Sequence, residues 1–554
     1  MEKRLILAIV LSFLVLLGWN HFFNKPRTAP EAPSVREQPA PESGAVVRRE
    51  RVRTPGPETV AAPAEPETAP EMAPFGGGSE QDIVVETSLY RAVWSSKGGI
   101  LKSWRLKAHR DADKEDLEIV PAQADEVGLF PFMIDLDDPG LADRLNAEIF
   151  EASPGAVNLR DGDSGELRFV YSDGASVRVD KTFRVTGGTY AVEMSVRVWR
   201  NGQSLPAVVL WGPGVGNPSP AELKQRFSAT TGTAVYAGGK VQRMDERKYK
   251  AETSAWNFVD WAAYEENYFV ALFVLPPQKG QAMFLKEMAG EEPVFSLSVT
   301  QPRRVFIGPK ETEALKAFGH DAKKVINFGF FGSISEILLA AVRYFHSLVP
   351  NWGLAIILLT IVVKLIFFPL TYSSTKSMAK MADLQPKMKA IRAKYKKSKS
   401  DIEQRRQMNE EMMKLYKEHG VNPAGGCLPL LIQMPVFWGV FRMLVVSVEF
   451  RHAPFALWIQ DLSVKDPYYV TPILMGITQF ISQKLTPTSA DPVQARMMLI
   501  MPFIMTIFFM NFQSGLVLYW LTTNVLQIAQ QALMNRMMAR QKREQKDGQR
   551  KKAR

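Results

Sequence analysis

Residues 352–370 read WGLAIILLTIVVKLIFFPL, and this stretch decides the class of fold. It carries a single charge, at Lys364. A helix needs about 20 predominantly apolar residues to cross roughly 30 Å of hydrocarbon. The stretch therefore predicts a membrane-spanning helix, which we place at 351–372.

Other parts of the chain share this apolar character. Residues 1–24 combine a short basic flank with an apolar run, which predicts an amino-terminal transmembrane anchor; a cleaved signal peptide is the alternative, although no small-residue cleavage site follows. Residues 427–535 hold four more apolar stretches, which predict transmembrane helices 3–6. The last two, 497–512 and 515–534, would also fit a re-entrant hairpin. The chain is thus predicted to be a polytopic α-helical membrane protein with six transmembrane helices.

Between the first two predicted spans lies a region of different composition. Residues 25–80 contain eleven prolines, which predicts a disordered Pro/Ala/Glu tether. Residues 81–326 alternate apolar and polar side chains between turn dipeptides, for example at 167–171, 177–185 and 190–199, as antiparallel strands do. This predicts a large β-sandwich domain. Residues 327–350 then form an amphipathic pattern at helical spacing, which predicts an interfacial helix lying on the membrane.

Residues 373–426 predict a helical hairpin. Their apolar side chains recur at helical spacing in two runs separated by Lys396-Lys-Ser-Lys-Ser400, and Pro386 predicts a kink in the first helix. Two interpretations stay open: a packed helix pair, or an adaptable methionine-rich surface that touches apolar partners. The side chains expected to make these contacts are Met378, Met381, Leu384, Met388 and Met412.

Charge predicts the topology. The chain has 554 residues and a net charge of +11. The hairpin segment 373–426 carries 13 Lys/Arg against 6 Asp/Glu, and the tail 536–554 carries 9 against 2. Basic loops stay in the cytoplasm, so we expect a cytoplasmic hairpin, a basic cytoplasmic tail, both termini inside and the β domain outside. A β domain of this size between two spans fits the periplasm of a Gram-negative bacterium.

Lys364 is costly at its depth in the bilayer, because a lysine at the centre of a span is unfavourable by about 2.5–3.5 kcal/mol. Its side chain could snorkel to the interface or line a wet cavity. The cavity is favoured by polar side chains in the other predicted spans, notably Gln433, Thr522 and Asn524. A second charge, Arg442, lies near the outer end of its span, where snorkelling outward is the simpler interpretation.

Several chemistries are excluded. The six histidines are scattered, the single cysteine is Cys427, and no phosphate-binding loop is present, so we expect no enzyme activity, metal site or cofactor. The basic tail could bind anionic lipids, or the ribosome through RNA phosphates; no DNA partner is expected.

Several motifs resemble one family. The stretches 378–388, 422–435 (NPAGGCLPLLIQMP), 453–463, 466–476 and 514–520 are similar to the YidC membrane-protein insertases of Gram-negative bacteria. They cover most of 350–535, whereas the anchor, tether and β domain match the family in their order along the chain more than in their residue sequence.

This resemblance implies a periplasmic β-supersandwich and an inner-membrane insertase that works alone or with the Sec translocon on nascent membrane proteins. It implies a hydrophilic groove whose cation falls on Lys364, where the family usually has arginine, with sensitive residues at Thr360 and at Tyr519 or Trp520. Two rivals are a transporter, which would need inverted repeats that the sequence lacks, and a carbohydrate-binding domain on an anchor.

Overall fold

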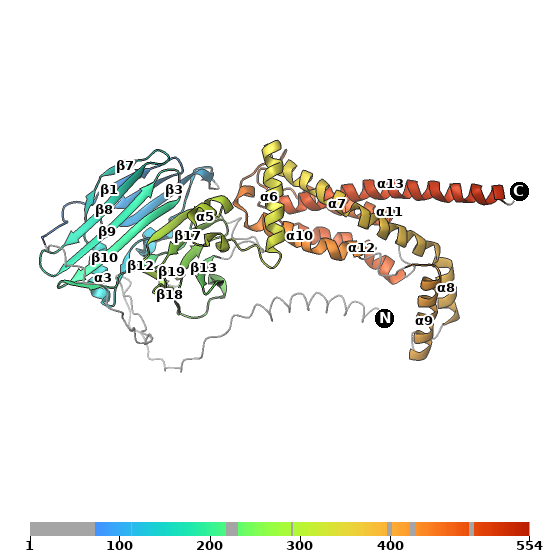
Figure 1. Ribbon diagram of the computed structural model, residues 1–554, viewed down its shortest axis with the longest axis horizontal. Coiled ribbons are helices and arrows are strands. Elements are labelled where there is room, and N and C mark those ends of the chain that lie inside the picture. Colours follow the sequence, from blue (N-terminus) through green and yellow to red (C-terminus); the bar gives the residue numbers. More distant parts are fainter. Residues whose placement is uncertain are drawn as a thin grey trace.

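The structure is a computed structural model that describes residues 73–111, 113–217, 231–289, 292–395, 401–421, 428–486 and 492–552. The predicted anchor 1–24, the tether up to residue 72, Cys427 and the last two residues of the tail lie outside these ranges. Figure 1 shows a strand-rich half at one end and a bundle of helices at the other, with α6 (Gly332–Leu348) between them.

The predicted meander is confirmed. Strands β8 (Ser164–Ser172), β9 (Val177–Thr186) and β10 (Ala191–Arg200) pair in antiparallel order, with Leu167 opposite Phe183 and Val192 opposite Val185. Alternation of apolar and polar residues brings one set of side chains to the inner face, because successive residues of a strand point to opposite faces.

These strands belong to a ten-stranded sheet that forms one layer of the domain. Its path is β14–β13–β16–β17–β20–β10–β9–β8–β6, with β11 paired to β10. The remaining members are β6 (Glu151–Ser153), β11 (Gln203–Leu205), β13 (Gly232–Ala237), β14 (Lys240–Asp245), β16 (Trp261–Glu265), β17 (Phe269–Val274) and β20 (Arg304–Pro309).

Two five-stranded sheets complete the domain. The first runs β4 (Asp116–Glu118), β3 (Ile100–Arg110), β2 (Tyr90–Ser95), β1 (Asp82–Glu86) and β7 (Ala156–Asn158). The second runs β15 (Thr253–Asn257), β18 (Gln281–Ala289), β19 (Glu292–Thr300), β12 (Val208–Trp211) and β5 (Ile134–Asp135). Short helices occupy the connections: α2 (Gln123–Val127), α3 (Pro139–Ala147), η1 (Glu246–Lys248), α5 (Thr312–Phe318) and η2 (Ala322–Val325).

Aromatic side chains join the layers. Trp94 of β2 lies 4.3 Å from Phe183 of β9, and Phe132 lies 5.9 Å from Trp211 of β12 and 6.2 Å from Phe273 of β17 (ring centroids). Large buried rings contribute most of the apolar area of such a core. All three sheets therefore share one core, as the predicted β-sandwich requires.

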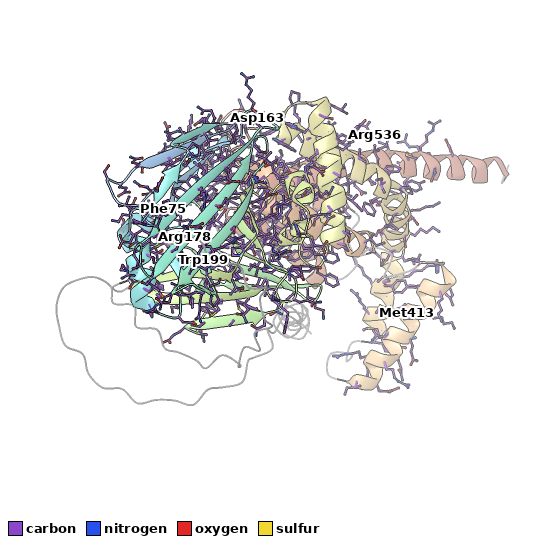
Figure 2. The ribbon with its side chains drawn as sticks, turned by 60° about the vertical axis from the view of Figure 1, so that its left-hand side comes forward. Phe75, Asp163, Arg178, Trp199, Met413 and Arg536 are labelled. Atoms are coloured by element: carbon purple, nitrogen blue, oxygen red, sulfur yellow. The ribbon has the colours of Figure 1, made fainter. Side chains whose placement is uncertain are left out.

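The end of the predicted tether lies on this domain. The backbone of Phe75 pairs with that of Ser172 of β8, and the guanidinium of Arg178 lies 5.1 Å from the centre of the Phe75 ring. Figure 2 labels Phe75 and Arg178 close to one another. Glu80 accepts a hydrogen bond from Ser95. The disordered interpretation of 25–80 is therefore wrong for its last residues, because Phe75 finds an apolar and cationic surface to pack on.

The helical half begins with α7 (Trp352–Asp383), a continuous helix of 32 residues. It is the one helix in the described ranges that is both long and apolar enough to cross a membrane by itself; shorter apolar stretches cover Ile432–Val446 and Met498–Phe509. The count of six spans stays a prediction.

Helix α7 stops just before Pro386. The chain is interrupted at Leu384 and resumes as α8 (Gln385–Lys394), with Pro386 in its first turn, where the missing N–H costs no helical hydrogen bond. This interruption agrees with the predicted kink. Helix α9 (Ile402–Glu418) then packs against α8, and Figure 1 shows the two side by side.

Four further helices cover the predicted later spans. They are α10 (Leu428–Val446), α11 (Val470–Leu485), α12 (Pro492–Phe509) and α13 (Ser514–Lys552). A single turn, η4 (Val448–Phe450), lies in the loop after α10. Helix α13 continues without a break from the last predicted span into the basic tail, as Figure 1 shows, because Ala, Gln, Met, Lys and Arg are all strong helix formers.

Candidate functional site

Lys364 lies on α7 and its side chain crosses to α13. Its Nζ donates a hydrogen bond to Oε1 of Gln527 at 3.0 Å. The next two residues on α7, Leu365 and Ile366, are 64% and 67% exposed and form part of the outer apolar surface of the helices. The amine therefore faces the interior of the helical bundle, between α7 and α13.

Helix α13 presents a row of amides on one face. Asn524, Gln527, Gln531 and Asn535 are spaced by three, four and four residues, which places them one above another on a helix. Asn524 Nδ2 donates to the carbonyl of Met475 at 3.1 Å, and Asn535 Nδ2 to that of Leu485 at 3.3 Å.

Both acceptor carbonyls belong to α11, so the row ties α13 to its neighbour. Of these amides, sequence reasoning selected only Asn524 for the groove. The three- and four-residue spacing was the signal that would have found the others.

Tyr519 and Trp520 lie on α13 just before this row of amides. The indole N–H of Trp520 donates to Gln479 of α11 at 3.0 Å, while its ring contacts Phe437 of α10 and Phe509 of α12, with centroids 5.0 and 5.3 Å away. Tyr519 is 1% exposed. Its hydroxyl lies beside Gln433 of α10 and Thr523, without a hydrogen bond to either in the described part of the chain.

Unpaired polar atoms mark the interior of these helices. Within the described ranges no hydrogen-bond partner is present for five buried side-chain atoms on α11 and α13: Tyr519 Oη, Thr523 Oγ1, Gln483 Oε1, Gln530 Nε2 and Gln531 Oε1. A buried polar group without a partner is destabilising by about 1–3 kcal/mol. Such atoms are suited to bind water or the polar groups of another chain.

Three other hydroxyls have different surroundings. Thr360 is buried and donates to the carbonyl of Ile356 in its own helix at 2.7 Å, so its oxygen has a partner within α7. Thr522 is half-buried on α13. Thr506 of α12 donates to Pro502 at 2.8 Å and packs so closely on Gly476 of α11 that a Cβ there would lie 1.9 Å from its Oγ1.

Lys364 has no carboxylate partner in the described helices. Helices α10, α11 and α12 contain no Asp or Glu, α7 has its first at Asp383 and α13 its first at Glu544. The polar interior is thus cationic, with amide and hydroxyl neighbours only.

Aromatic rings occupy the end of the helices nearest the β domain. Phe441 of α10 lies 5.9 Å from Phe512, which lies 4.8 Å from Phe508 of α12. Beyond them the loop from η4 to α11 is organised around the buried Asp466, which accepts hydrogen bonds from Trp458 Nε1, Tyr468 N and both N and Oγ1 of Thr471. This end is filled by apolar side chains and a folded loop.

Arg442 projects from α10 toward the β domain. Its guanidinium donates to the carbonyl of Asn327, in the segment that joins the β domain to α6. The side chain thus points toward the β domain, and its outward direction in the membrane stays a prediction.

The helix pair α8–α9 forms a small core of its own. Leu384 and Met388 are buried with Leu415, Tyr416 and Val421, and Met381 and Met412 pack against them. The packed interpretation thus accounts for most of the predicted contact residues. Met378 lies outside this cluster and is half-buried on α7, so a partner-binding role stays a prediction there.

No group of His, Cys, Asp and Glu side chains in the described ranges could hold a metal ion. The groups gathered here can attract an anion and exchange hydrogen bonds.

Two family models match the chain. Residues 344–542 match "60Kd inner membrane protein" and residues 82–341 match "YidC periplasmic domain". A curated relative from Syntrophus aciditrophicus, named Membrane protein insertase YidC, is 37% identical over 97% of this chain and 100% of its own length. One of the same name from Geobacter sulfurreducens is 36% identical over 97% of this chain and 99% of its own.

Solved structures are more distant. A structure titled "Active YidC insertase crystal structure with the first transmembrane domain resolved" is 23% identical and covers 83% of this chain and 95% of that chain, with a TM-score of 0.36. A putative aldose 1-epimerase from Escherichia coli K12 is 13% identical over 40% of this chain and 89% of that chain, with a TM-score of 0.25.

Proposed function

This chain belongs to the YidC family of membrane protein insertases, and we propose that it receives nascent hydrophobic segments in the groove around Lys364 and releases them sideways into the inner membrane. The family is one of inner membrane proteins with a periplasmic domain, and an insertase is not an enzyme class.

The Lys364–Gln527 contact is the observation that carries the proposal. A segment that enters a membrane must bring its polar flank through hydrocarbon, where each unsatisfied polar group costs several kcal/mol. The ammonium of Lys364, the α13 amides and the unpaired atoms of Tyr519, Thr523 and Gln530 supply partners for that flank. Because these groups offer hydrogen bonds in place of water, the groove lowers the free-energy barrier to moving the polar flank across the membrane.

Lateral release follows from the apolar surfaces beside the groove. Helix α12 exposes Phe503, Ile504 and Ile507, each more than half accessible. A client helix that slides along α10 and α12 buries its own apolar side chains in lipid, which is favourable by about 25 cal/mol per Å². This free energy is sufficient to drive insertion, so no nucleotide or cofactor is required.

The direction of insertion is set by the two ends of the groove. The aromatic cluster around Phe512 and the Asp466 loop fill the end toward the β domain. We place that end and the β domain in the periplasm, and the α8–α9 hairpin, both termini and the basic tail in the cytoplasm. Six spans, the first within 1–24, complete this topology.

Partners follow from the same arrangement. Nascent membrane proteins are the clients, and we propose that the protein acts alone or with the Sec translocon. The α13 extension carries Arg536, Arg540 and Arg543 beyond the predicted span; Figure 2 labels Arg536 where this extension begins. A basic helix there suits anionic lipids and ribosomal RNA.

Reconstitution tests this function. The full-length protein in liposomes, without nucleotide, is expected to move the translocated flank of a small membrane protein into protection from external protease. Lys364→Ala is expected to reduce protection of a client with an acidic flank by about fivefold, the value of one partly screened charge interaction. Absence of protection with the wild-type protein would contradict the proposal; equal loss for acidic and neutral flanks would contradict the role of the charge.

A further inference from the structure

Gln527 gives the Lys364 ammonium a neutral partner, and we propose that this contact makes Gln527 a positioning residue that sets the preference of the groove for acidic client flanks. The inference rests on the proposed function, since it concerns which clients the same groove accepts. It is carried by the 3.0 Å contact between Lys364 Nζ and Gln527 Oε1 and by the absence of a carboxylate from the described parts of α7 up to Ala382, α10, α11 and α12.

The chemistry of the pair leaves the charge available. An ammonium has three N–H donors and an amide oxygen accepts one of them without cancelling the positive charge. Two donors remain for a client. A carboxylate at position 527 would instead form an ion pair and leave no net charge in the groove.

The position of Gln527 is fixed by its neighbours on α13. Asn524 lies one turn before it and Asn535 two turns beyond, and each is bonded to a backbone carbonyl of α11. These contacts hold the face of α13 that carries Gln527, so its amide oxygen is presented to α7 at a fixed height.

A lysine side chain is flexible, so a hydrogen-bond partner is required to hold its ammonium in one place. Its flexible four-carbon stem carries a point charge, whereas an arginine presents a rigid planar fork with five donors. An ammonium held at one place by Gln527 selects a single carboxylate by charge rather than by two parallel hydrogen bonds. Gln527 therefore restricts the positions that the flexible ammonium of Lys364 can occupy.

Three changes separate this role from a structural one. Gln527→Glu keeps the shape of the side chain and neutralises the ammonium, so it is expected to abolish the preference for acidic flanks. Gln527→Leu removes the acceptor and is expected to weaken the preference about threefold to fivefold. The exchange Lys364→Gln/Gln527→Lys returns an ammonium to the same space from the opposite helix and is expected to restore most of the preference.

The experiment uses the full-length protein in liposomes and two clients that differ only by Asp or Asn at two positions of the translocated flank. The readout is the ratio of acidic to neutral client protected from protease. Gln541→Glu, which places the same charge at an exposed site further along α13, is the control and is expected to leave the ratio unchanged.

The neutral client separates this inference from the proposed function. If the neutral client inserts with wild-type protein and the ratio falls with Gln527→Glu and recovers in the exchange variant, the inference stands. A ratio that stays at the wild-type value in Gln527→Glu, or an exchange variant that inserts the neutral client but has no acidic preference, would overturn it. Failure of the neutral client with the wild-type protein would refute the insertase proposal itself.

Discussion

Lys364 and Lys181 are both shielded from water, at least in part, and their hydrogen-bond partners differ. Lys364 is held by one amide in the helical bundle. Lys181 is fully buried in the β domain, where its Nζ donates to the carbonyls of Gly98 and Phe132 at 2.6 and 2.8 Å. Lys364 is half-buried, whereas Lys181 is enclosed by backbone carbonyls and the ring of Phe150.

The enclosed lysine makes stability depend on pH. Burial lowers the pKa of Lys181 from 10.5 to about 7. Between these values the unfolded chain binds more protons than the folded domain, so this group makes the free energy of unfolding rise with pH, by about 1.4 kcal/mol per pH unit at most. Lys181→Met removes that contribution.

The measurement is urea unfolding of residues 73–326 followed by tryptophan fluorescence at pH 7, 8 and 9. The difference in unfolding free energy between the wild type and Lys181→Met is expected to change across this range, whereas the exposed control Lys240→Met gives a constant difference. A constant difference for Lys181→Met as well would show that the buried amine keeps its ordinary pKa.

At the scale of elements, the hairpin and the helix contacts allow separate tests. Met388 is 4% exposed within the α8–α9 core, whereas Met413 of α9 is 48% exposed and is labelled on the surface of the hairpin in Figure 2. Met388→Ser is expected to destabilise the hairpin by about 2–4 kcal/mol, because it removes buried apolar volume and introduces a hydroxyl.

Hydrogen exchange of residues 385–421 checks this expectation. Faster exchange throughout α8 and α9 in Met388→Ser, with no change in Met413→Ser, is the expected pattern. Equal protection in both variants would show that the α8–α9 core does not hold the hairpin together.

The α11–α12 contact depends on a glycine. A Cβ at Gly476 would lie 1.9 Å from Thr506 Oγ1, and small residues allow such close helix packing in membranes. Gly476→Ala is expected to lower the thermal stability of the detergent-solubilised protein, with partial recovery in Gly476→Ala/Thr506→Ala. No recovery in the double variant would place the clash elsewhere.

Sequence reasoning succeeded where the signal is local. The two-residue alternation of 177–185 predicts β9, and the apolar run at 352–370 predicts most of α7, because both periods follow from backbone geometry. It did not give the pairing of β12 with β5 or of β20 with β10, since these strands meet across long stretches of chain. These strand pairings are decided by side-chain packing in the folded domain and not by a local sequence pattern.

The candidate site was foreseen in the same uneven way. Lys364 stands out because a charge in an apolar run is visible in the sequence, whereas Gln527 is one of several polar residues of the last predicted span and nothing local distinguishes it. That Thr360 bonds its own helix depends on a rotamer, which the sequence does not encode locally.

At the scale of the whole molecule, the β domain is fastened to the helices. Asn267 Nδ2 donates to the carbonyl of Val445 at the end of α10 at 2.8 Å, and the guanidinium of Arg451, just after η4, donates to the carbonyl of Arg110 of β3 at 2.6 Å. Together with the bond from Arg442 to Asn327, these contacts fix the end of α10 that carries Phe441. The β domain therefore supports the end of α10, which is one wall of the proposed groove.

Removing one of these contacts is expected to loosen that wall. Asn267→Leu leaves the carbonyl of Val445 without this donor and is expected to increase hydrogen exchange at 443–450 about tenfold, the effect of about 1.4 kcal/mol on local opening. Arg184→Leu, on the exposed face of β9, is the control. Unchanged exchange at 443–450 would mean that the domain only rests on the helices.

The most direct test of the groove is photo-crosslinking to a ribosome-bound nascent membrane protein. A photoreactive amino acid at Gln433, at Thr522 or at the exposed Met501 of α12 is expected to capture the client, while the same group at Leu457, in the exposed loop on the β-domain side, is expected to capture none. Crosslinks from the three helix positions but not from Leu457 would support a groove that is open inward and sideways. Absence of crosslinks at all three helix positions, with the client still inserted, would contradict it.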